Sequence, residues 1–132
     1  MKYFSLILTF LIALSCNIQK EKIDISTFEL SEIPESLYGC SCLFSKSKQE
    51  YDAEKYMYFD DFGDNCLISI DNKIIFLKPE GDKYKNEYYT AYIQNKIQID
   101  EGYESATYNA ELIIVDKKGN RRIYKVYGIC GC

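Results

Sequence analysis

The chain has 132 residues, the size of a single domain, and 47% of them are hydrophobic, which is enough to form a core. The formal net charge is −4 and neither sign forms a long run, so a basic surface for nucleic acid is not expected. The absence of His excludes Ser-His-Asp and Cys-His catalysis and removes the usual nitrogen ligand of zinc and copper. A glycine-rich phosphate loop is also absent, and we expect neither enzymatic activity nor a cofactor.

The first sixteen residues, MKYFSLILTFLIALSC, predict an export signal, because Lys2 precedes an apolar run over 3–14. That run is shorter than the roughly 20 residues that span a bilayer. Its end, ALSC, resembles the lipobox of bacterial lipoproteins, in which the Cys is acylated and becomes the mature N-terminus; Ala13 stands where that motif prefers Leu. The resemblance implies a signal peptide over 1–15 and a lipid on Cys16. An ordinary signal peptide and an uncleaved anchor are the alternatives.

Residues 16–36 are polar and charged with scattered apolar positions, and we expect a tether between the lipid and a domain over 37–132. Within this segment QKEK resembles the charged tags that direct some lipoproteins of the Bacteroidota to the cell surface, although a solvated tether is the simpler interpretation. The resemblance implies an exported protein, anchored to the bacterial envelope at the outer membrane or the cell surface.

The rest of the sequence predicts an all-β domain. From residue 38 onward, short runs rich in aromatic and β-branched residues alternate with turn residues, and none keeps a helical period. The expected strands are 38–45, 55–61, 65–70, 73–78, 87–99, 108–116 and 121–130. About seven short strands with tight turns predict a small antiparallel meander, either a barrel or a sandwich.

The stretch ISIDNKII is the clearest hairpin, with its turn at Asp71-Asn72. This turn pairs Ile68 with Ile75 on one face and Leu67 with Phe76 on the other. Both faces are mostly apolar, so the hairpin should be covered on two sides, as in a barrel or a sandwich.

Two Cys-x-Cys pairs lie about ninety residues apart, at Cys40 and Cys42 and at Cys130 and Cys132. An exported domain meets oxidising conditions, which favour disulfides. Residues i and i+2 of a strand share a face, so an antiparallel first and last strand would join Cys40 to Cys132 and Cys42 to Cys130. The same register places Phe44 opposite Gly128, where the ring can cover the bare backbone.

Other uses of these cysteines remain open. A parallel register would join Cys40 to Cys130 and Cys42 to Cys132, and four thiolates could instead hold zinc or copper(I). Thiol-disulfide exchange is a third use, although the usual Cys-x-x-Cys arrangement is missing. Cys66 shares a face with apolar neighbours in the hairpin, and we expect it to be buried and free.

Three further features are weaker candidates. The stretch DDFGDN at 60–65 offers calcium ligands, but Asp, Asn and Gly are also the residues of an ordinary turn. Tyr88 and Tyr92 could stack on a sugar, although strand tyrosines more often pack at a core or rim. Glu101 and Glu104 could form a glycosidase pair, although the chain is small for such a substrate cleft and acidic loop residues are usually solvated.

The combined expectation is an envelope lipoprotein that binds a protein or a glycan without catalysis. Its partners would be the membrane, through the lipid on Cys16, and an envelope ligand. The alternative function is a metal-handling or thiol-redox lipoprotein that uses the two Cys-x-Cys pairs.

Overall fold

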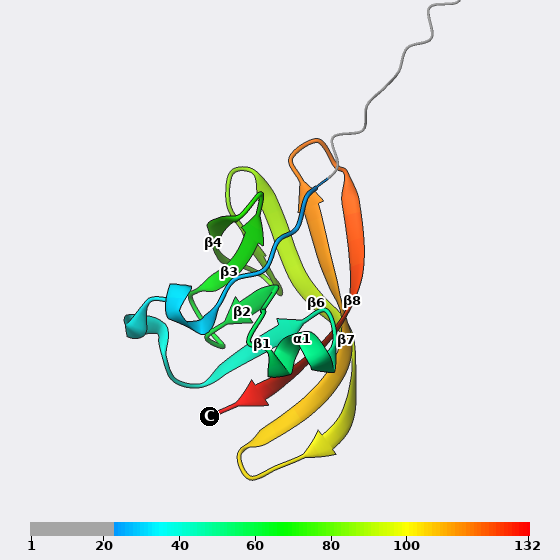
Figure 1. Cartoon of the computed structure of the whole chain (residues 1–132). Helices are drawn as coiled ribbons and strands as arrows, with labels where there is room; N and C mark the ends of the chain where they lie inside the picture. Colours follow the sequence, from blue (N-terminus) through cyan, green and yellow to red (C-terminus); the bar gives the residue numbers. More distant parts are fainter. Residues whose placement is uncertain (1–22) are drawn as a thin grey trace, which may run out of the picture.

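The computed structural model describes residues 23–132, which form a closed barrel of eight antiparallel strands in sequence order (Figure 1). The predicted all-β meander is therefore confirmed, and it closes as a barrel. The predicted signal peptide over 1–15 and the lipidation site Cys16 lie outside the described residues. The strands are β1 Ser41–Ser45, β2 Tyr58–Asp60, β3 Cys66–Ile70, β4 Lys73–Glu80, β5 Lys83–Lys85, β6 Tyr89–Glu101, β7 Ser105–Asp116 and β8 Arg121–Gly131.

The strand β5 was not among the seven predicted strands. It is only three residues long and pairs with β4 on one side and with β6 on the other. Gly81, with φ +63°, turns the chain between β4 and β5. Such a short strand has too few residues to show an alternating pattern.

The predicted registers are confirmed. Ile68 lies opposite Ile75 and Leu67 lies opposite Phe76, and the turn residues Asp71 and Asn72 both have positive φ. The last hairpin turns at Gly119, with φ +85°, and joins β7 to β8 over eleven residue pairs without a bulge. Turn chemistry and the two-residue period of a strand together set these registers.

Alternate residues of the strands face two different hydrophobic clusters. Residues such as Phe44, Tyr58 and Ile68 fill the barrel, while Phe59 and Leu67 point outward from β2 and β3. Both outward side chains are buried, with 2% and 0% exposure. The hairpin is therefore covered on two sides, as its apolar faces predict.

The outer cover comes from residues 23–37, although the sequence predicts a polar tether over 16–36. Phe28 and Ile33 are each only 1% exposed and pack against Phe59 and Leu67. Single β-bridges join Ile25 to Ile70 and Phe28 to Tyr56. The segment crosses the β2–β3 side of the barrel in Figure 1, shown in blue. From residue 23 onward the chain thus belongs to the folded domain, and the predicted boundary at residue 36 lies too late.

Short helices complete the described chain. The 3-10 helices η1 (Leu30–Glu32) and η2 (Glu35–Leu37) lie in the outer segment, and α1 (Lys48–Asp52) follows β1. The Ser47 hydroxyl caps α1 by accepting a hydrogen bond from the Glu50 amide. Within residues 23–132, every helix is too short or too polar to cross a bilayer.

Candidate functional site

Two disulfides join the first strand of the barrel to the last, and we call them the clasp. Cys40 is bonded to Cys132 and Cys42 to Cys130, with Cα atoms 4.0 Å apart in each pair. The strands β1 and β8 are antiparallel, with Cys42 directly opposite Cys130. The predicted pairing is confirmed, and the parallel alternative is wrong.

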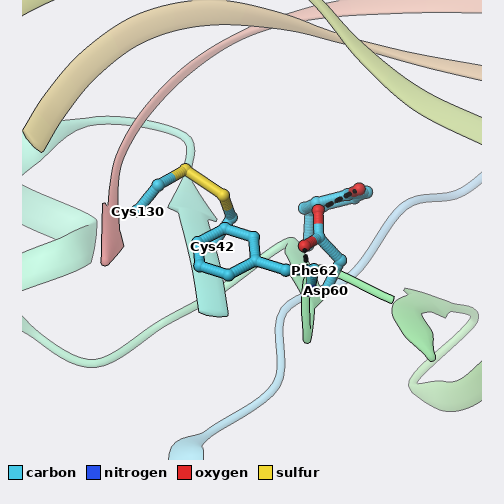
Figure 2. Close-up of a disulfide and its surroundings, with 5 residues drawn as sticks. Cys42, Asp60, Phe62 and Cys130 are labelled. Carbon is cyan, nitrogen blue, oxygen red and sulfur yellow. Dashed lines mark hydrogen bonds between the residues drawn. A yellow bond between two sulfur atoms is a disulfide. The ribbon is translucent and has the colours of Figure 1, made fainter. Parts of the chain in front are cut away.

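The two bridges of the clasp lie in different surroundings. Cys42 is buried beside Phe44 in the barrel interior, whereas Cys40 and Cys132 are exposed at the barrel rim. Figure 2 shows the Cys42–Cys130 bridge spanning the two strands, with Asp60 nearby. A metal or thiol-redox site would need these four sulfurs as thiolates. In this structure they are paired in two disulfides.

Cys66 is free and fully buried, as predicted. Its register partner on β2 is Asp60, whose partner on β1 is Cys42, so the thiol and the buried bridge lie on one row of the barrel interior. Burial raises the pKa of the Cys66 thiol well above its usual value, and the nearby Asp60 carboxylate acts in the same direction. A protonated thiol is a poor nucleophile, so the inner row is not organised for thiol-disulfide exchange.

A buried carboxyl lies between these sulfurs. Asp60 is 9% exposed; its carboxylate accepts hydrogen bonds from the Tyr58 hydroxyl at 2.7 Å and from the Phe62 amide at 3.0 Å (Figure 2). Burial raises the pKa of Asp60, and the Tyr58 hydrogen bond opposes that change. The adjacent cavity of about 150 Å³ also reaches Tyr84 and Lys96. Both polar contacts of Asp60 are internal, which gives this carboxyl a structural role in joining β2 to the loop after it.

The calcium candidate at 60–65 is a turn. The Asp61 carboxylate accepts hydrogen bonds from the Gly63 and Asn65 amides and from the Asn65 side chain. These contacts hold the loop between β2 and β3 closed. In residues 23–132 the His, Cys, Asp and Glu side chains form no cluster of three that could hold a metal ion.

The tyrosine and glutamate candidates are dispersed. The rings of Tyr88 and Tyr92 lie beneath the ammonium groups of Lys117 and Lys83, at 4.9 and 4.6 Å from the ring centroids. A sugar that stacked on these faces would have to displace those cations. Glu101 ends β6 and Glu104 follows in the exposed β6–β7 turn, outside every cavity described here.

The pairing of β1 with β8 covers only part of β8. β1 pairs with β8 only as far as Ser45, which lies opposite Tyr127, although β8 begins at Arg121. Within residues 23–132, residues 121–126 of β8 pair with β7 alone. We call this half-paired stretch and the cavities beside it the seam.

The seam holds the two largest cavities described here. A cavity of about 500 Å³ separates β8 from the outer segment; its walls include Ile25, Thr27, Met57 and Tyr124. A second cavity of about 630 Å³ lies over β6, β7 and β8 beside the start of α1. Lys46 and Lys125 line both cavities, so the two cavities form one continuous surface.

Sequence patterns do not predict the seam. The one sequence feature that marks it is the start of β8, RRIYK at 121–125, a strand with three cations in five residues in an acidic protein. That charge is unusual for a strand buried on both sides and marks an exposed edge.

Comparison with protein-family models, curated proteins and solved structures finds no match to this chain.

Proposed function

We propose that this protein is exported, attached to the bacterial envelope by a lipid on Cys16, and binds a protein partner at the seam. The observation that carries the binding proposal is the half-paired edge of β8, flanked by cavities of about 500 and 630 Å³. Ligand sites in proteins typically occupy a few hundred to a thousand Å³ of concave, mostly apolar surface.

A protein fits the seam better than a glycan does. The edge of β8 offers backbone donors and acceptors, which another strand satisfies along its whole length. The tyrosine faces that would favour a sugar carry lysine side chains at 4.6 and 4.9 Å. Binding rather than catalysis is supported by the lack of His and by the internal hydrogen bonds of Asp60, the most buried carboxyl of the described residues.

Lipid attachment predicts that Cys16→Ser abolishes incorporation of a radiolabelled fatty acid and releases the protein from the membrane fraction. The reason is that acylation requires the thiol of the cysteine that ends ALSC. Cys66→Ser is the matched control, because Cys66 lies inside the barrel and should not affect labelling. A Cys16→Ser protein that still takes up label would contradict the proposal.

Partner binding predicts that a photoreactive amino acid in place of Thr27 forms a discrete crosslink to one envelope protein in intact cells. Thr27 is exposed and lines the seam, whereas Asp82 is exposed at the β4–β5 turn and serves as the control position. Mass spectrometry would identify the crosslinked protein. If the probe at position 27 forms no crosslink, or forms the same crosslinks as the probe at position 82, binding at the seam would be ruled out.

A further inference from the structure

We infer that the partner enters the seam as an extended strand that alternates acidic and apolar residues and pairs with residues 121–126 of β8. This inference rests on the proposed function and names the chemistry of the partner. Six residues of strand span roughly 20 Å, so a segment of six or seven residues would fill the half-paired edge.

The backbone of β8 is oriented to accept such a strand. The amide of Cys132, just past the end of β8, donates to the carbonyl of Glu104, just before β7, so the even-numbered residues of β8 direct their polar backbone groups toward β7. The β7–β8 register has no bulge, and the orientation therefore alternates along the whole strand. Arg121, Ile123 and Lys125 thus turn their N–H and C=O groups toward the open side.

The inner face of the added strand would contact apolar side chains of the seam, so we expect apolar residues on that face. Met57 is only 4% exposed, and it forms the floor of the seam together with Tyr124. Ile25 lies on the opposite wall. Alternate side chains of a strand that continues the line of β1 would point at this floor.

The outer face of the added strand would meet positive charge. Arg121, Lys125 and Lys46 are exposed, and none of them forms an ion pair within residues 23–132. The pairs found in that range join Lys48 to Asp52 and Lys85 to Glu80. Acidic residues at the outward positions would be complementary to this charge, in a protein whose formal net charge is −4.

The same charges disfavour a second copy of this chain as the occupant. An antiparallel pairing of two β8 edges centred on Ile123 would place Arg121 of each copy opposite Lys125 of the other. Like charges directly opposite one another destabilise a strand pair. Cations on a free edge also prevent nonspecific sheet growth, so they select a partner of the opposite sign.

The test measures the affinity of a fluorescein-labelled, seven-residue peptide of alternating Glu and Val by fluorescence anisotropy in about 0.15 M salt, where weak surface attraction is screened. We expect saturable binding. Replacing every Glu of the peptide by Lys should abolish it. Two further peptides carry N-methyl groups on every second residue, one on the Glu residues and the other on the Val residues. Binding should be lost for only one of them, because only the N–H groups on one side of the peptide strand form hydrogen bonds with β8.

The double variant Lys46→Glu with Lys125→Glu should weaken binding of the acidic peptide at least tenfold and create binding of the lysine peptide. Lys73→Glu is the matched control, since Lys73 is exposed and lines neither cavity of the seam. Circular dichroism would verify that each variant is folded. A peptide that binds both variants equally, or that tolerates both sets of N-methyl groups, would overturn the inference.

The two proposals fail in distinguishable ways. If Thr27 crosslinks to a partner but the acidic peptide does not bind, the partner docks without adding a strand, and only the inference is wrong. If Thr27 captures nothing, the proposed function fails whatever the peptide does. A dimer in sedimentation that becomes tighter with Lys125→Glu, which would replace the repulsion between Arg121 and Lys125 of the two copies by attraction, would assign the seam to a second copy and overturn the inference.

Discussion

Replacing all four cysteines of the clasp with Ala is expected to lower the melting temperature by roughly 20 °C. The outer bridge spans 92 residues, and closing a loop of that length stabilises the folded state by about 4–5 kcal/mol in the chain-entropy model. A domain of this size has a total stability of only about 5–15 kcal/mol. Because each kcal/mol shifts the melting temperature by about 4 °C or more, the loss is large enough to measure by calorimetry.

Removing one bridge should cost far less than half of that amount. With Cys40→Ala and Cys132→Ala, the remaining bridge still closes a loop with a sequence separation of 88, so little chain entropy is regained. The buried bridge should cost somewhat more, since Cys42 packs beside Phe44 in the barrel interior. The two losses should therefore add to less than the loss in the quadruple variant.

A mismatched pair provides the control for the clasp. Cys40→Ala with Cys130→Ala leaves Cys42 and Cys132 without partners, and unfolded protein should show two more reactive thiols than wild type. The matched pair Cys40→Ala with Cys132→Ala should show the same number of reactive thiols as wild type. If each single-bridge variant lost half of the full effect, the loop-closure explanation would be contradicted.

The clasp and the central hairpin were predictable because strand geometry alone determines them. Residues two apart share a face, so one antiparallel register aligned both cysteine pairs and also placed Phe44 opposite Gly128. The Asp71-Asn72 turn determined the pairing of β3 with β4 in the same way. Each prediction needed only local rules and one long-range pairing.

The burial of three apolar side chains within residues 23–37 was not predictable from the same rules. Ile23, Phe28 and Ile33 lie five residues apart, a spacing that follows neither a helical nor a strand period. Phe28 and Ile33 are buried because Phe59 and Leu67 present an apolar outer face that the barrel itself cannot cover, whereas Ile23 packs against the cluster inside the barrel. The sequence showed that the β3–β4 hairpin needed two covers, but it did not show that the preceding segment supplies one of them.

The seam depends on where two strands end relative to each other. β1 ends at Ser45 because the chain turns into α1, capped by Ser47, while β8 continues for six residues beyond the last pair with β1. Sequence patterns locate strand ends only within a few residues. A cavity formed by such an offset, and the pair of lysines that line it, required the structure.

Gly128→Ala is expected to destabilise the barrel by about 3 kcal/mol or more, the upper range for over-packing a core. A Cβ at this position would overlap the backbone carbonyl oxygen of Leu43 and would lie 2.6 Å from Cδ1 and 2.8 Å from Cα of Phe44. The buried bridge of the clasp joins β1 to β8 only two residues away, so the strands cannot move apart to make room. Urea unfolding, monitored by circular dichroism, would measure the loss.

Two further variants separate this steric effect from the general cost of replacing glycine. Gly63→Ala should stay within about 0.5 kcal/mol of wild type, because a Cβ there would meet only the Asp61 carboxylate at 3.8 Å. Adding Phe44→Leu to Gly128→Ala should recover little stability. The closest clash is with the backbone of Leu43, and a smaller side chain at position 44 does not relieve it. Full recovery in that double variant would mean that the aromatic ring, rather than the close approach of the two strands, requires glycine at position 128.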